Sequence, residues 1–216
     1  MDYAAARHNM VESQLRTNKV IDERLIDAMA RVPREAFLPD RQKAVAYVDE
    51  DIPVGRDRYM IEPMVFARLV QAVGLQLGAR VLLVGAATGY GAAVLAAMGA
   101  SVIALEAQSD VAANTKIALS RNGIGAAVVE APFDAGWPGG APYDAIVFDG
   151  AIGALPDCYG GQLAEGGRIA AVVAVQGEPG RATVWRKFGG DLTARVIFDA
   201  ATPVLPGLAR EPGFVL

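Results

Sequence analysis

The sequence predicts an α/β protein built on a mostly parallel open sheet, with a helical N-terminal segment and a terminal antiparallel hairpin. Residues 81–84 are an unbroken run of Val and Leu, which is typical of a strand covered on both faces. Strand-like and helix-like segments then alternate as far as residue 175, as in parallel sheets. Two strand-like segments, 182–188 and 192–199, flank Gly189-Gly190-Asp191, which indicates a hairpin that adds one antiparallel strand.

The first 55 residues are predicted to be helical and separate from the sheet. Asp22 can cap a helix whose apolar face contains Leu25, Ile26, Met29 and Val32. Residues 37–55 predict a loop with one short helix and a solvated charged face. A further helix is expected to begin at Pro63 and to end at Gly74.

The remaining elements follow from the same patterns. One domain is expected, made of an N-terminal helical cap (1–62), a ligand-binding α/β core (63–180) and a terminal hairpin with its tail (181–216). Within the core we predict helices at 91–98, 110–121 and 155–163, and strands ending at Glu106 and covering 126–130, 144–149 and 168–175.

Composition excludes several classes of function. The chain has 216 residues, and a net charge of −4 without a basic run argues against nucleic acid as a partner. One cysteine, Cys158, cannot form an internal disulfide, and one histidine, His8, is too few for a multi-histidine metal site. The charged N-terminus and the lack of a run of about 18 apolar residues predict a cytoplasmic protein that does not span a membrane.

A glycine-marked turn after the first core strand predicts a nucleotide-like ligand. Gly85, Gly89 and Gly91 lead into a helix, and Glu106 closes the next strand about 20 residues on, where an acid can accept hydrogen bonds from ribose hydroxyls. The spacing G-x-x-x-G-x-G is not the pattern that cradles a pyrophosphate. S-adenosylmethionine therefore fits better than NAD, although a plain strand-turn-helix with a solvated Glu106 stays open.

The carboxyl ends of parallel strands should gather the site residues at one edge of the sheet. This edge would hold the turn at 85–89, Glu106, the loop 131–136 and Asp149. Asp149 could meet the reactive end of the ligand or cap the following segment. Phe133 and Trp137 could form an apolar wall for an adenine ring or simply pack.

The chain resembles the protein-L-isoaspartate O-methyltransferases over nearly its whole length, through MVESQLR (10–16), DERLIDAMARVPREAFLPD (22–40), AYVDEDIPVG (46–55), GYGAAVLAAM, GWP, YDAIVFDGA and LAEGGRIAAVV. The resemblance implies a Rossmann-like methyltransferase fold with a seven-stranded sheet and S-adenosylmethionine as donor. It also implies isoaspartyl residues of damaged proteins as acceptors, and so a role in protein repair. The donor-binding positions would be Gly85, Ala86, Ala87, Gly89, Tyr90, Glu106, Ala107, Phe133, Asp134 and Asp149.

This chain departs from the family pattern at several of these positions. Ile61 stands where the family has an active-site serine, so the catalytic residues stay unassigned, with Arg58 and Tyr59 as acceptor-loop candidates. The family's donor loop carries an acid and a central glycine where this chain has Leu83 and Ala87, which predicts weakened donor binding. A further family acid is replaced by Pro132, and Asp134, two residues on, is the candidate to compensate for it.

Three functions remain open at this level. The first is a protein carboxyl methyltransferase acting on isoaspartyl residues of a protein or peptide. The second is a paralogue without catalysis that serves as a binding or assembly module, and the third is a methyltransferase with another acceptor. The hairpin edge and the apolar tail 205–216 could support a homodimer or fold back on the sheet, and the sequence does not decide between them.

Overall fold

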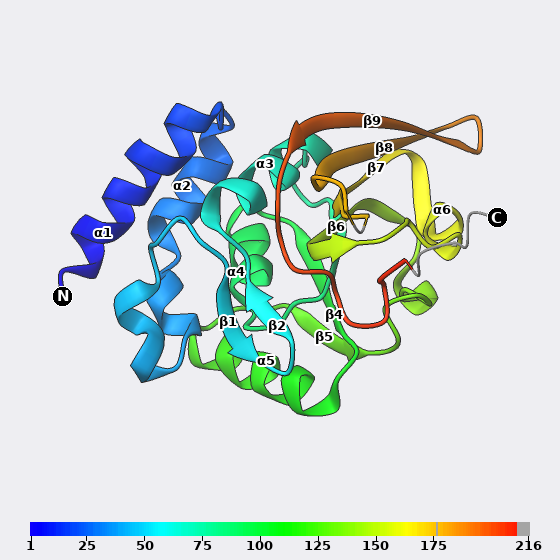
Figure 1. The fold of residues 1–216 in the computed structure, drawn as a ribbon. Helices are drawn as coiled ribbons and strands as arrows, with labels where there is room; N and C mark the ends of the chain where they lie inside the picture. Colours follow the sequence, from blue (N-terminus) through cyan, green and yellow to red (C-terminus); the bar gives the residue numbers. More distant parts are fainter. Residues whose placement is uncertain (176, 211–216) are drawn as a thin grey trace.

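A seven-stranded sheet organises the structure, a computed structural model that describes residues 1–175 and 177–210 (Figure 1). The strand order is β5-β4-β3-β6-β7-β8-β9, and only β8 runs against the others. The predicted mostly parallel sheet with a terminal hairpin is therefore confirmed. The strands are β3 (Arg80–Val84), β4 (Ser101–Glu106), β5 (Ala127–Glu130), β6 (Tyr143–Ile152), β7 (Leu163–Val173), β8 (Arg181–Phe188) and β9 (Asp191–Asp199).

Both faces of the sheet are buried. Along β3, Val81 and Leu83 belong to one apolar cluster and Leu82 and Val84 to another, because successive side chains of a strand point to opposite faces. This double burial explains the unbroken apolar run in the sequence. Chain order reverses between β3 and β6, so the carboxyl ends of these strands border the crevice where open α/β sheets bind ligands.

The helices begin and end largely where their capping residues predict. Asp22 accepts hydrogen bonds at the start of α2, and Gly74, with φ of +63°, ends α3 in the left-handed conformation. The helices are α1 (Tyr3–Met10), α2 (Glu23–Arg31), α3 (Pro63–Val73), α4 (Tyr90–Ala97), α5 (Ser109–Arg121) and α6 (Cys158–Gln162).

A small second sheet was not predicted from the sequence. Strands β1 (Ile52–Gly55) and β2 (Arg58–Met60) form an antiparallel hairpin in a region that we predicted to be a loop followed by a lead into α3. Its turn residues Arg56 and Asp57 both have positive φ, at 57° and 54°. Arg is an unusual residue for that conformation, so the sequence carried no hairpin signal of the Asn-Gly kind.

The tail after β9 folds back on the sheet over the part of it that the structure describes. Ala151 donates a hydrogen bond to the carbonyl of Pro203 (2.9 Å) and accepts one from the amide of Leu205 (2.8 Å). This pairing helps to carry β6 three residues beyond its predicted end at Asp149. The predicted tail also includes 211–216, which lie outside the described residues.

Two other predicted boundaries were wrong. The helix predicted at 155–163 is only α6, because Leu163 already begins β7, five residues before the predicted start of that strand.

Among the helices of residues 1–175 and 177–210, none is long and apolar enough to cross a membrane.

Candidate functional site

Glu106 is the buried centre of the predicted site. It closes β4 with no exposed surface. Its Oε1 accepts a hydrogen bond from the amide of Ala107 (2.9 Å), and its Oε2 accepts one from the amide of Ala87 (3.0 Å). The alternative of a merely solvated Glu106 is therefore wrong, since this carboxylate is held by the glycine-marked turn.

Arg58 of β2 supplies the remaining partners of that carboxylate. Its Nε and Nη2 donate to Oε2 of Glu106 at 3.3 and 3.2 Å, and the Arg58 side chain is only 2% exposed. The guanidinium carbon lies 5.4 Å from the ring centre of Phe133. A Cβ placed on Gly85 would lie 2.8 Å from Nη2, so the guanidinium rests directly on the glycine turn. Arg58 thus touches three of the predicted donor-binding residues.

The turn keeps a glycine-like geometry although one glycine is replaced. Gly85 and Gly89 have φ of +83° and +89°, and Ala87 has φ of +44°. A left-handed conformation costs a non-glycine residue roughly 1–2 kcal/mol. The conformation of Ala87 is fixed from both sides, because its amide donates to Glu106 and its carbonyl accepts from Oγ1 of Thr115 at 2.5 Å.

Two of the three other departures from the family pattern are buried apolar side chains, whereas Pro132 is exposed. Leu83 has no exposed surface, and Ile61 is 2% exposed. Neither side chain can pair with a charged ligand group. A ligand at this site therefore meets neither an acid at position 83 nor a hydroxyl at position 61.

Asp149 lies inside β6, not at its end as predicted. The strand register shifts between Val147 and Ala151, and the Asp149 carboxylate approaches Gly91 of α4 so closely that a Cβ there would lie 2.8 Å from Oδ2. Burial raises the pKa of Asp149 to about 7, although the positive charges of Arg58 and Arg34 act in the opposite direction. This carboxyl group can therefore hold a proton near neutral pH.

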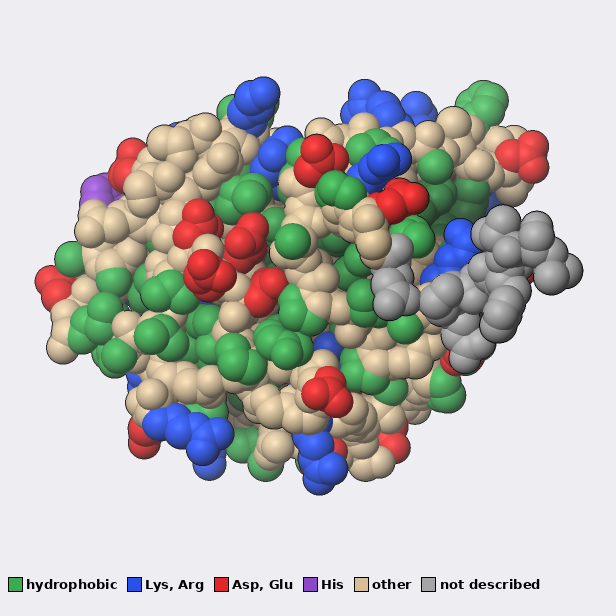
Figure 2. Space-filling view, in the orientation of Figure 1, with side chains coloured by type: hydrophobic (Ala, Val, Ile, Leu, Met, Phe, Trp, Pro, Cys, Tyr) green, Lys and Arg blue, Asp and Glu red, His purple; other side chains and the backbone are tan. Residues whose placement is uncertain are grey.

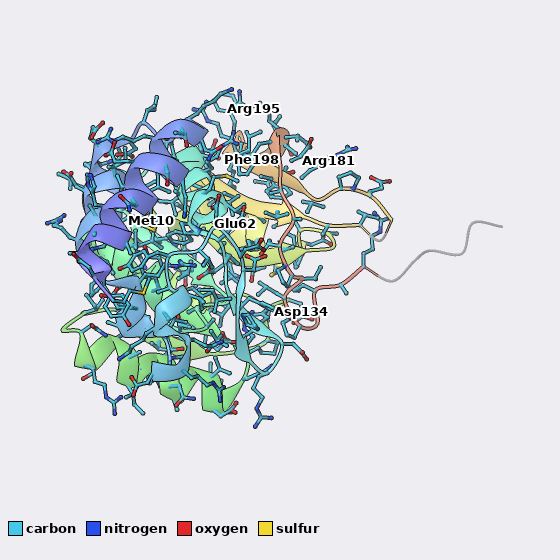
Figure 3. All side chains as sticks on the ribbon, turned by 60° about the vertical axis from the view of Figure 1, so that its left-hand side comes forward. Met10, Glu62, Asp134, Arg181, Arg195 and Phe198 are labelled. Carbon is cyan, nitrogen blue, oxygen red and sulfur yellow. The ribbon has the colours of Figure 1, made fainter. Side chains whose placement is uncertain are left out.

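A cluster of acids lies beside the start of α3. The amide of Glu62 donates to Oδ1 of Asp51 (2.9 Å), and burial, followed by the charges of Asp49, Asp51 and Glu50, raises the pKa of Glu62 to about 7. We call Asp49, Glu50, Asp51 and Glu62 the acidic rim. Figure 2 shows acidic side chains gathered on the face in view, and Figure 3 shows Glu62 near the middle of the molecule.

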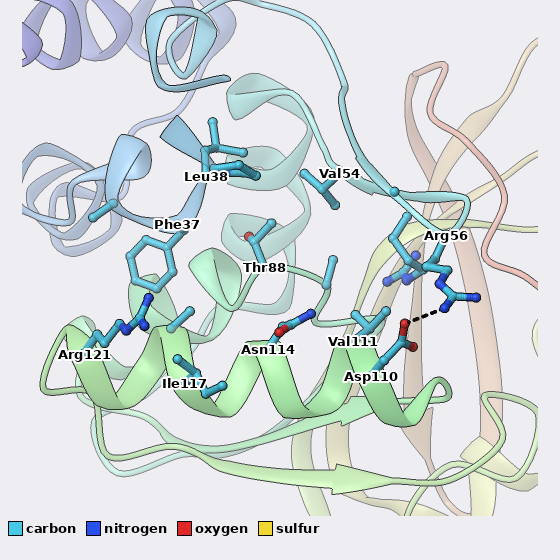
Figure 4. Close-up of a pocket in the computed structure, with 16 residues that line it drawn as sticks. Phe37, Leu38, Val54, Arg56, Thr88, Asp110, Val111, Asn114, Ile117 and Arg121 are labelled. Atoms are coloured by element: carbon cyan, nitrogen blue, oxygen red, sulfur yellow. Dashed lines mark ion pairs between the residues drawn. The ribbon is translucent and has the colours of Figure 1, made fainter. Parts of the chain in front are cut away.

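A cavity of about 330 Å³ opens on the α5 side of the β1–β2 hairpin (Figure 4). Arg58, Ala87 and Thr88 belong to its lining. At one end Arg56 forms an ion pair with Asp110 of α5 at 3.0 Å. The sequence analysis did not predict this cavity, because residues distant in the chain (36–39, 54–58 and 110–121) line it and no single motif marks it.

The other predicted residues divide into those near Glu106 and those elsewhere. Ala86 and Ala107 flank the turn and Glu106, whereas Tyr90 is buried against Phe37 and Phe66. Asp134 is exposed (Figure 3). Tyr59 is half-buried on β2. No group of His, Cys, Asp and Glu that could hold a metal ion occurs among residues 1–175 and 177–210.

Comparison with known proteins decides the family. The family model for protein-L-isoaspartate(D-aspartate) O-methyltransferase matches residues 6–198. The chain belongs to this family. A protein-L-isoaspartate O-methyltransferase of Methylorubrum populi is 41% identical over 182 residues, covering 84% of each chain, and that of Gloeobacter violaceus is 35% identical over 88% of this chain and 93% of its own.

Solved structures agree with the family assignment. A protein-L-isoaspartate O-methyltransferase superposes with a TM-score of 0.84 at 25% identity, over 94% of this chain and 67% of its own. A Plasmodium falciparum structure described as a putative member, in complex with S-adenosyl-L-homocysteine, has a TM-score of 0.78 at 18% identity, over 95% and 98% of the two chains. At that identity the second likeness supports the Rossmann-like methyltransferase fold alone.

Proposed function

We propose that this protein transfers a methyl group from S-adenosylmethionine to the side-chain carboxylate of isoaspartyl residues in proteins. One observation carries the proposal: a chain of this family holds the buried acid Glu106 against the turn at 85–89, and Arg58, which pairs with it, lies 5.4 Å from the ring centre of Phe133. An acid, a close backbone approach and an aromatic wall are the groups that a nucleoside needs.

The residues of the site suit the donor on one condition. The Glu106 carboxylate can accept hydrogen bonds from ribose hydroxyls, but Arg58, whose guanidinium lies over the Phe133 ring, already occupies that carboxylate. The proposal therefore requires the guanidinium to leave. Leu83 supplies no charge for the methionine end, so we expect weaker donor binding than in relatives with an acid there.

Methyl transfer to a carboxylate asks the protein mainly for positioning. The donor, when bound, supplies an electrophilic methyl group on a sulfonium. A carboxylate is already a competent nucleophile, so proximity and orientation provide most of the acceleration and no base is needed. Protonated Asp149 would not repel the acceptor carboxylate, whereas ionised Asp149 would.

The test is transfer of labelled methyl groups to an isoaspartyl peptide, with the aspartyl peptide of the same sequence as control. The proposal predicts carboxyl methyl ester on the isoaspartyl peptide and background on the control. No turnover above background on either peptide, at saturating donor and with the protein folded, would contradict it and favour the paralogue without catalysis.

A second candidate is a methyltransferase with a different acceptor. Ile61 removes the family's hydroxyl, and the acidic rim around Glu62 disfavours an acceptor surrounded by negative charge. The same assay separates the two with peptides that have Lys or acidic residues flanking the isoaspartyl residue. Turnover on protein extracts combined with none on either isoaspartyl peptide would favour the second candidate.

A further inference from the structure

The Arg58–Glu106 pair occupies the centre of the proposed donor site. Oε2 of Glu106 has no lone pair left for a ligand, because it already accepts three hydrogen bonds. Two come from Nε and Nη2 of Arg58, and the third comes from the amide of Ala87. Oε1 already accepts one hydrogen bond from Ala107. A ribose diol brings two further O–H donors, and this carboxylate cannot receive both while Arg58 remains.

The guanidinium also fills the space beside the carboxylate. It rests on Gly85, where a Cβ would lie 2.8 Å from Nη2, and its central carbon lies 5.4 Å from the ring centre of Phe133. These are the two surfaces, turn and aromatic wall, between which a nucleoside is expected. Arg58 therefore occupies the contacts on Glu106, on the turn and beside Phe133 that the neutral sugar and its base would need.

We propose that Arg58 is an internal competitor of the donor, a protein side chain that holds Glu106 until a nucleoside displaces it. This inference rests on the proposed function, since it concerns the same site. Donor binding and release of the β1–β2 hairpin are then one event. The apparent association constant of the donor equals the intrinsic one multiplied by the fraction of molecules in which Arg58 has left Glu106.

The tip of the hairpin that carries Arg58 has few restraints. Its strands contain only four and three residues, and the tip residues Arg56 and Asp57 are exposed, although Ile52 and Met60 at its base are buried in the core. Its turn is held to α5 by the exposed Arg56–Asp110 pair, and exposed pairs of this kind contribute little. The cavity of about 330 Å³ that Arg58 borders gives the displaced side chain a place to go (Figure 4).

The test is calorimetric titration of the full chain and its variants with S-adenosylhomocysteine. Arg58→Gln should bind at least tenfold more tightly than the natural protein, because a charge-assisted competitor is gone. Arg58→Lys keeps a positive charge near Glu106 but cannot donate the paired hydrogen bonds of a guanidinium. Its affinity for S-adenosylhomocysteine should therefore fall between those of the natural protein and Arg58→Gln. This second variant keeps the test decisive if loss of the counter-ion of Glu106 prevents Arg58→Gln from folding.

Arg56→Gln is the matched control. It removes an arginine two residues away on the same hairpin, one that pairs at the surface with Asp110 and makes no contact with Glu106. Because the pair of Arg56 with Asp110 holds the hairpin turn to α5, its loss should tighten donor binding by at most about fivefold, less than Arg58→Gln does. Equal or weaker binding by both Arg58 variants would overturn the proposal, because Arg58 would then support the donor or the fold instead of competing.

The methylation assay separates this inference from the proposed function. Tighter binding by the Arg58 variants without turnover on isoaspartyl peptides would support the competitor and contradict the proposed function. Turnover by the natural protein without tighter binding by the variants would contradict the competitor alone. Absence of both binding and turnover in all folded variants would contradict both.

Discussion

At the scale of single residues, the contact of Gly85 with its neighbours decides how tightly the site is closed. Gly85 has φ of +83°, and a Cβ there would lie 2.7 Å from the Leu205 side chain and 2.8 Å from Arg58 Nη2. We predict that Gly85→Ala lowers the free energy of unfolding by about 2–4 kcal/mol, which combines backbone strain with overpacking. Urea denaturation measures this loss.

Gly123 offers the matched control, because its φ is +68° and nothing lies within 4 Å of a Cβ there. Gly123→Ala should lose only the backbone part, about 1–2 kcal/mol. Equal losses for the two variants would mean that Arg58 and Leu205 do not press on the turn.

Asp149 should make stability depend on pH. Burial raises its pKa to about 7, while an unfolded aspartate titrates near 4. The folded state therefore holds the proton more tightly, so the stabilisation is complete below about pH 4 and is lost as pH rises to about 7. For Asp149 alone, the free energy of unfolding should fall by about 2 kcal/mol between pH 5.5 and pH 8.

The variant Asp149→Asn isolates this effect. Its loss of stability between pH 5.5 and pH 8, measured by urea denaturation, should be smaller than that of the natural protein by that amount. Glu62, whose pKa is also raised to about 7, accounts for part of what remains. Identical losses in the two proteins would show that Asp149 ionises normally in the fold.

At the scale of elements, the segment after β9 covers the carboxyl end of the central strand β6. Leu205 is 1% exposed and lies against both Gly85 and Gly150, and its own amide donates to the carbonyl of Ala151, whose amide donates to Pro203. We predict that Leu205→Ala costs about 2–5 kcal/mol in denaturant unfolding. Leu77→Ala, at a leucine that is 76% exposed, should cost less than about 0.5 kcal/mol. Similar costs for both would mean that the tail does not pack on the sheet.

The sequence predicted those elements whose signals are local. Asp22, Pro63 and Gly74 fixed the ends of α2 and α3 through capping, and the apolar run at 81–84 indicated a buried strand. The β1–β2 hairpin lacked such a signal, since its strands are short and its turn contains Arg56 and Asp57 in a conformation that favours glycine. The extension of β6 could not be predicted either, because it depends on pairing with a tail some 50 residues away.

The same limit applies to the site. The acid Glu106 and the turn at Gly85 were predictable because the spacing of a strand, a turn and a helix brings them together. The pairing of Arg58 with Glu106 was not, because it joins residues 48 apart through the missed hairpin. A variant Leu83→Glu with the family's acid would place a carboxylate at a position with no exposed surface.

At the scale of the whole molecule, the tail and the β1–β2 hairpin lie at the carboxyl ends of the central strands (Figure 1). Arg58 of this hairpin stands in the place proposed for the donor's sugar. The fold of the family is intact, while Arg58 occupies the acid of the site that we propose for the donor. Because the donor must displace Arg58 from Glu106, the conformation of the hairpin should differ between the free and the bound protein.

The most direct test is a crystal structure of the complex with S-adenosylhomocysteine. The account predicts the ribose hydroxyls on the Glu106 carboxylate, the base beside Phe133, and the Arg58 guanidinium withdrawn from Glu106. A nucleoside bound at this edge with Arg58 still paired to Glu106, or bound elsewhere on the protein, would contradict it.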